Sequence, residues 1–174
     1  MLTCGAAHNI VRWVAPLNVS AAEIDEGLAH IERATGVRCA EGRDGEPVTA
    51  GRIYLAPGNF HMTLEGTAAG GVIRLNQNPP ENFCRPSVDP MLRSLASIYG
   101  AAVLTVILTG MGSDGQKGAA EIVAAGGTVI AQDEATSVVW GMPGAVATSG
   151  LCAAVLPLKE IGPSVRKLVM RSAA

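Results

Sequence analysis

The sequence of 174 residues is poor in several features that would place it in a specialised class of protein. Aromatic residues make up 3% of it, charged residues 16%, and the formal net charge is −2. Because there is no basic excess, we expect no nucleic-acid partner. No apolar run approaches the ~20 residues that a membrane-spanning helix needs, and the first seven residues lack the basic start of a signal peptide. We therefore expect no membrane insertion.

Cysteine is also scarce, and its spacing is uninformative for binding. The four cysteines are widely scattered and none forms a C-x-x-C pair: Cys4, Cys39, Cys84 and Cys152. This spacing argues against a disulfide framework and a structural zinc site, so we expect a reduced, cytoplasmic protein with no metal and no cofactor. Apolar residues make up 48% of the chain, which is ample for the core of a single domain over residues 1–174.

The most informative stretch is residues 103–115, which read VLTVILTGMGSDG. A continuous apolar run of this kind is typical of a buried parallel strand. It ends in a glycine-rich loop that carries Asp114 and precedes a helix-like segment over residues 116–125. Open α/β sheets place their ligands at such strand–loop–helix junctions. We therefore expect Asp114 at the mouth of a site, although an Asp beside a helix start often only caps that helix.

Helix and strand patterns alternate along most of the chain. Residues 20–23 match a capping box before a helix over 21–34, and Ser87 is expected to cap a helix that ends at Gly100. Further elements are expected as strands at 52–56, 127–131 and 151–157, a hairpin at 61–64 and 71–75, and helices at 142–149 and 159–170. The alternation after Ser87 predicts a parallel sheet with crossover helices. The expected fold class is α/β, with a three-layer, mostly parallel, doubly wound sheet and a small antiparallel hairpin added to it.

Two kinds of site can be weighed from the residues themselves. Gly110, Gly112 and Gly115 fit the G-x-G-x-x-G pattern, and Asp133 lies where a ribose-binding acid would follow, which leaves a dinucleotide-binding module as one hypothesis. Asp114 argues against it, because it would put a negative charge among the amides that cradle a pyrophosphate. No Gly-x-Ser-x-Gly elbow occurs, and His61 in the hairpin is expected to be structural or solvated.

Around Asp114 the sequence resembles the chemotaxis protein-glutamate methylesterases, that is, the CheB catalytic domain. The resemblance rests on residues 107–115 (ILTGMGSDG) and on five further blocks in the order of that family. These blocks are 44–47 (DGEP), 53–59 (IYLAPGN), 85–89 (RPSVD), 131–135 (AQDEA) and 138–143 (VVWGMP). The match runs from about Ala34 to the C-terminal helix.

The resemblance implies hydrolysis of glutamyl methyl esters on chemoreceptors in bacterial chemotaxis, and some glutamine deamidation, by a Ser-His-Asp triad. In that scheme the Ser attacks the ester carbonyl, the His is the base, and the Asp stabilises the imidazolium. Asp114 matches the triad Asp, and the backbone N–H of Met111 matches an oxyanion donor. The implied partner is a methylated chemoreceptor.

The other two triad members are not found. In this chain, the nearest counterpart of the family's Gly-Ala-Ser-Thr-Gly-Gly turn has Ala7 where the Ser should be. An ungapped count places Asn18 at the position of the family's His. Residues 1–33 match the family poorly, no receiver domain is expected, and the first strand–helix unit is expected to be missing. We therefore expect impaired hydrolysis, or a non-catalytic receptor- or partner-binding protein, and exposed apolar surface around strand 103–109.

Overall fold

A computed structural model describes residues 2–5, 8–11 and 21–171. The elements follow one another as β1 (Leu2–Gly5), β2 (His8–Val11), α1 (Ala21–Thr35), β3 (Arg38–Glu41), β4 (Arg52–Leu55), β5 (His61–Thr67), β6 (Gly70–Asn76), α2 (Val88–Tyr99), a 3₁₀ turn η1 (Gly100–Ala102), β7 (Leu104–Ile107), α3 (Gln116–Ala124), β8 (Thr128–Gln132), α4 (Met142–Thr148), β9 (Ala154–Leu156) and α5 (Leu158–Arg171). This order confirms the α/β class, the early helix, the hairpin and the alternation after Ser87.

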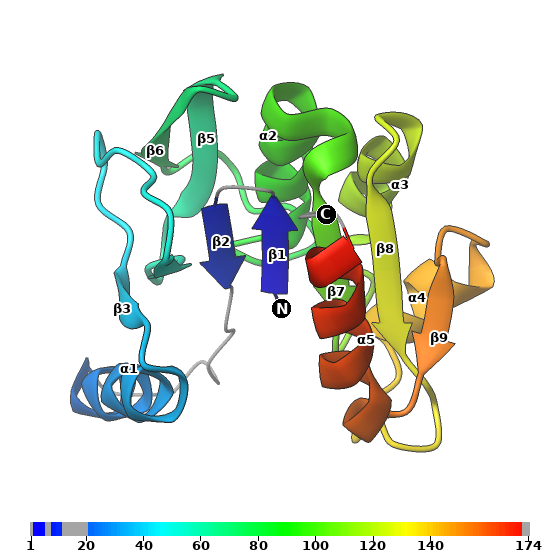
Figure 1. Cartoon of the computed structure of the whole chain (residues 1–174). Coiled ribbons are helices and arrows are strands. Elements are labelled where there is room, and N and C mark those ends of the chain that lie inside the picture. Colours follow the sequence, from blue (N-terminus) through cyan, green and yellow to red (C-terminus); the bar gives the residue numbers. More distant parts are fainter. Residues whose placement is uncertain (1, 6–7, 12–20, 172–174) are drawn as a thin grey trace.

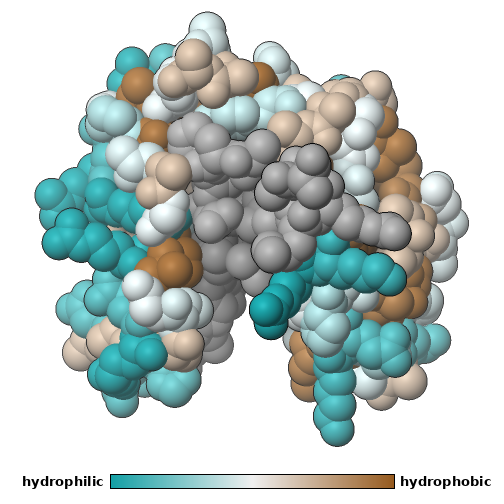
Figure 2. Space-filling model, viewed as in Figure 1, coloured by the Kyte–Doolittle hydropathy of each residue, from teal (hydrophilic) through white to brown (hydrophobic). Residues whose placement is uncertain are grey.

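The part of the fold that positions the site is the parallel sheet β7-β8-β9. Leu104 pairs with Thr128 and Ile130 pairs with Ala154, so all three strands run in the same direction. Helix α5 crosses one face of the sheet, and α2, α3 and α4 cover the other (Figure 1). The apolar face of β7 packs with α2 and α3 into one core. β9 is the edge strand, and Figure 2 shows hydrophobic residues exposed along that side of the molecule.

Helices α2 and α3 approach each other closely at Gly118. A Cβ atom at this position would lie 2.6 Å from the Cβ of Leu92 and 3.1 Å from the backbone of Asp89. The close approach therefore depends on the missing side chain. It brings the first turn of α3 against the first turn of α2, and both turns take part in the site described below.

The turn at residues 43–47 supports the hairpin rather than standing free in solvent. The Asp44 carboxylate accepts a hydrogen bond from the Leu75 amide at 2.9 Å, and the Gly45 amide donates to the Ile73 carbonyl at 2.9 Å. The DGEP block thus fastens one arm of the hairpin to the rest of the molecule. Strand β3, which precedes this turn, was not predicted, and it pairs in parallel with β4.

The expected exposure around strand 103–109 is wrong. Val103 and every residue of β7 are buried. The N-terminal hairpin explains this, because β1 lies beside β7 and β2 lies beside β4 (Figure 1). These strands occupy the space between β4 and β7. Among the described residues, no helix is long and apolar enough to cross a membrane.

Candidate active site

The loop at the carboxyl end of β7 carries Asp114, as the sequence predicts. Gly112 and Gly115 have φ angles of +80° and +94°, which a residue with a Cβ atom rarely adopts. Their left-handed conformations turn the chain sharply before α3. Asp114 is folded inward by this turn, and only 5% of it is exposed.

The Asp114 carboxylate lies at the N-terminus of α2, which argues against the alternative that it only caps the helix that follows it. Its Oδ2 accepts the Val88 amide at 2.8 Å, and its Oδ1 lies 3.4 Å from the Asp89 amide. Gly115, not Asp114, is the N-cap residue of α3. The first amides of a helix have no partner within the helix, and the Asp114 carboxylate supplies acceptors for them.

Ser87 has a different role from the predicted one. It occupies the N-cap position of α2 but its side chain makes no capping hydrogen bond. Instead its hydroxyl donates to Asp114 Oδ1 at 2.6 Å. A carboxylate from another element thus takes over the capping function, and the N-cap hydroxyl holds that carboxylate in place.

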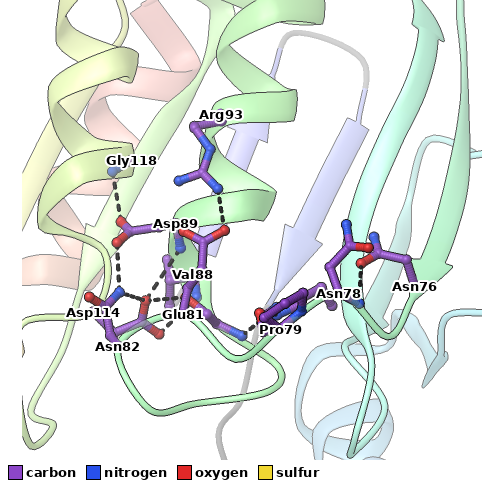
Figure 3. A network of polar contacts seen from close by, with 12 residues as sticks. Asn76, Asn78, Pro79, Glu81, Asn82, Val88, Asp89, Arg93, Asp114 and Gly118 are labelled. Carbon is purple, nitrogen blue, oxygen red and sulfur yellow. Dashed lines mark hydrogen bonds and ion pairs between the residues drawn. The ribbon is translucent and has the colours of Figure 1, made fainter.

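A second buried carboxylate, Asp89, is coupled to the first through Asn82 (Figure 3). The Asn82 side-chain amide donates to Asp114 Oδ1 at 3.0 Å and to Asp89 Oδ2 at 2.7 Å. Asp89 Oδ1 accepts the Gly118 amide at 2.7 Å. Asp89 is therefore more than a helix-start charge, because it ties α2, α3 and the loop before α2 together. Such networks are stable only when their buried oxygens are hydrogen-bonded, and both carboxylates accept several hydrogen bonds here.

Charged residues at the edge of this hydrogen-bond network also hold the surrounding loop in place. Glu81 and Arg93 form a salt bridge beside Asp89, and the hydrogen bond to Glu81 raises the pKa of the Arg93 guanidinium (Figure 3). Arg85 donates to Asn59 Oδ1 at 2.7 Å and to the carbonyls of Gln77 and Asn78. These contacts fix the loop over residues 77–86 above the two carboxylates.

A Ser, a His and an Asp do meet at this place, but not as a catalytic triad. In a triad the imidazole stands between the hydroxyl and the carboxylate. Here the Ser87 hydroxyl reaches Asp114 directly, and His61 Nδ1 accepts the Ser87 backbone amide at 3.2 Å. His61 Nε2 therefore carries the proton and donates to the Pro79 carbonyl at 3.1 Å. Both side chains are buried, so Ser87 and His61 are structural, and neither can meet a substrate.

The loop that carries Met111 is held by the segment over residues 136–142. The Gly110 amide donates to the Val139 carbonyl at 3.0 Å, and the Met142 amide donates to the Gly110 carbonyl at 2.8 Å. Gly141 allows this approach, because a Cβ there would lie 2.8 Å from the Gly110 oxygen. The Met111 N–H has no acceptor in the part of the chain that the structure describes. An N–H group on a fixed, exposed turn is what an oxyanion donor requires.

Buried Gln132 joins the same two segments. Its side chain accepts the Thr109 amide at 2.9 Å and donates to the Thr136 carbonyl at 2.6 Å. Asp133, the residue expected to bind a ribose in the dinucleotide hypothesis, closes its own turn by accepting the Thr136 amide at 3.0 Å. Asn82 and Gln132 were not singled out from the sequence, since nothing local distinguishes them from surface amides.

The predicted positions of the missing triad members, Ala7 and Asn18, lie outside the described residues, as does the Ser20 start of the capping box. Within the described residues, no group of three His, Cys, Asp or Glu side chains could hold a metal ion. Asp114 and the Met111 turn are thus the predicted site residues that the structure can place, and both belong to the same loop.

Comparison with known proteins agrees with this geometry. The family model described as CheB methylesterase matches residues 18–165. The protein-glutamate methylesterase/protein-glutamine glutaminase 1 of Paramagnetospirillum magneticum is 63% identical over 142 residues, which are 82% of this chain and 37% of that protein. The protein-glutamate methylesterase/protein-glutamine glutaminase of Azospirillum brasilense is 61% identical over 145 residues, 83% of this chain and 37% of that protein.

A solved structure is also similar. The crystal structure of the Thermotoga maritima CheB methylesterase catalytic domain has a TM-score of 0.83 and 36% sequence identity, and the match covers 92% of this chain and 82% of that one. The chain spans a little over a third, 37%, of the length of the curated relatives it matches.

Proposed function

Because this chain belongs to the CheB methylesterase family, we propose that it is a single methylesterase-type domain that recognises glutamyl methyl ester and glutamine side chains of chemoreceptors in the cytoplasm. We further propose that this chain binds such side chains but hydrolyses them poorly. The observation that carries the proposal is the position of Asp114. It lies in the family's signature loop, at the carboxyl end of β7, fixed by the amides of α2.

The oxyanion side of the reaction is supported by the Met111 turn. Ester hydrolysis and amide hydrolysis both place a negative charge on the former carbonyl oxygen. A backbone N–H on a turn that Gly110, Gly141 and Gln132 hold in place suits that charge and needs no reorganisation. A neutral ester or amide carbonyl is the ground-state group that this donor would bind.

Poor turnover follows from the missing nucleophile and base. The family scheme needs a Ser to form an acyl intermediate with release of methanol, and a His to take and return the proton. The nearest counterpart of the Ser turn has Ala7 where the Ser should be, and an ungapped count places Asn18 at the His position. Ser87 and His61 cannot replace them, because their hydrogen bonds turn both into the core. What is left is binding and the oxyanion donor, which together support only a residual rate.

The experiment that tests recognition is a titration of the purified chain with one chemoreceptor fragment in three forms: methyl ester, glutamine and free glutamate at the modified positions. The methyl ester and glutamine forms are expected to bind and the glutamate form to bind more weakly, since its carboxylate would approach the negative charge of Asp114. Equal binding of all three forms, or binding of none, would contradict the proposal.

A further inference from the structure

The most exposed apolar side chains of the described residues lie around the site. Phe83, Val138 and Met111 are 105%, 90% and 83% exposed, the three highest values among the large hydrophobic residues that the structure describes. All three lie on loops that contact Asp114 or its turn. Phe83 follows Asn82, which bonds to Asp114, Met111 is in the signature loop, and Val138 precedes the Val139 carbonyl that binds Gly110. We name these three residues the apolar rim.

Phe83 is exposed to solvent on a tight turn whose backbone conformation is unfavourable for phenylalanine. The amide of Glu81 donates to the carbonyl of Cys84 at 3.2 Å, and the amide of Cys84 donates back to the carbonyl of Glu81 at 2.9 Å. Between them Asn82 and Phe83 have φ angles of +52° and +62°. Two central residues with positive φ define a type I′ turn, whose favoured sequence is Asn-Gly.

Asn82 fits this turn, and Phe83 stands where glycine is favoured. A side chain with a Cβ is strained in the left-handed region, and the exposed ring of Phe83 gains no burial in return. The fold therefore gains nothing from phenylalanine at this position. An unfavourable aromatic residue on a rigid turn beside a site indicates a contact with something outside the chain.

We propose that the apolar rim binds the surface of the protein that carries the glutamyl side chain, with Phe83 as its anchor. This inference rests on the proposed function. The relatives are named for protein-glutamate and protein-glutamine, so the group they act on is a side chain of a protein. When such a side chain reaches the Met111 turn, the backbone and neighbouring residues of its protein must lie over the loops that surround the turn. An aromatic side chain with few rotamers loses little entropy on binding and is a common anchor of such contacts.

The test is the replacement Phe83→Gly, because it separates a contact role from a structural one. Glycine relieves the turn, so the thermal midpoint of the variant is expected to rise by roughly 2 °C. Its affinity for a methylated chemoreceptor fragment is expected to fall about tenfold, a loss typical of removing an interface anchor. Phe83→Leu keeps an apolar side chain on the same turn and is expected to recover most of the affinity.

Two controls complete the experiment. Val123→Ser removes an exposed apolar side chain at the far end of α3 and is expected to leave binding unchanged. A small probe, N-acetyl-glutamate γ-methyl ester amide, is too short to reach the rim, so its weak binding, followed by NMR, is expected to be the same for the parent chain and Phe83→Gly.

The outcomes distinguish this inference from the proposed function. If the parent chain binds the methylated fragment and Phe83→Gly binds it equally well, the inference is overturned and the proposed function stands. If Phe83→Gly loses stability together with affinity, Phe83 is structural and the inference is also overturned. If the parent chain does not bind the fragment at all, the proposed function fails and the inference fails with it.

Discussion

Replacing Asp114 by asparagine is expected to destabilise the whole domain, because the carboxylate is a structural element of the α2 N-terminus. It accepts hydrogen bonds of 2.6 Å from Ser87, 2.8 Å from the Val88 amide and 3.0 Å from Asn82. Hydrogen bonds to a charged acceptor contribute about 1 kcal/mol more than those to a neutral one. Three such bonds give a loss of about 3 kcal/mol in the free energy of unfolding. In addition, the NH₂ group of asparagine cannot accept a hydrogen bond, so it would face one of these donors without forming a bond.

A change of about 3 kcal/mol corresponds to a fall in the thermal midpoint of roughly 6–12 °C for a domain of this size. Calorimetry and urea unfolding at neutral pH measure it, with Asp25→Asn, an exposed Asp on α1, as the matched control. The control is expected to change stability by less than about 0.5 kcal/mol. An Asp114→Asn loss as small as that of the control would refute the argument that α2 depends on this carboxylate.

Two further predictions follow from packing and burial. Gly118→Ala is expected to destabilise the domain by about 1–3 kcal/mol, since the added methyl group meets Leu92 where α2 and α3 are in contact; unchanged urea unfolding would contradict it. Burial raises the pKa of the Cys152 thiol, and burial together with Glu32 raises that of Cys39. Both thiols are therefore expected to react with iodoacetamide near pH 8 more slowly than Cys84, which is exposed. Mass spectrometry of partly labelled protein measures the order of labelling, and faster labelling of Cys39 than of Cys84 would contradict the prediction.

The sequence predicts elements better than it predicts the contacts between them. The helix over residues 21–34 and the strand ending in the glycine loop were readable because their apolar periods are local properties. Strand β3 was missed because Arg38–Glu41 has no apolar pattern, and it owes its conformation to pairing with β4. The apolar run of β7 indicated a buried strand, but the N-terminal hairpin beside it was not predicted, because no local pattern indicates where that hairpin lies.

In the site, too, the local feature could be predicted from the sequence and its long-range contacts could not. Asp114 was found because its loop has a distinctive composition, but its partners lie 25–32 residues away along the chain. Sequence proximity favoured α3 as the helix that Asp114 caps, whereas packing at Gly118 brings it to α2 instead. Asn82 and Phe83 were overlooked for a related reason. The turn that contains them is recognisable only from its backbone angles, since phenylalanine hides the expected Asn-Gly signature.

The central claim is that this chain binds methylated glutamyl side chains although Asp114 has no nucleophilic Ser and no basic His beside it to complete a triad. Methanol release from a methylated chemoreceptor fragment, followed with the purified chain and with Asp114→Asn below its unfolding temperature, tests it most directly. We expect the parent chain to bind the fragment and both proteins to release methanol at the same low, residual rate, because neither contains a working triad. Methanol release by the parent chain that is lost in folded Asp114→Asn would contradict the account, because it would show a working triad that includes Asp114.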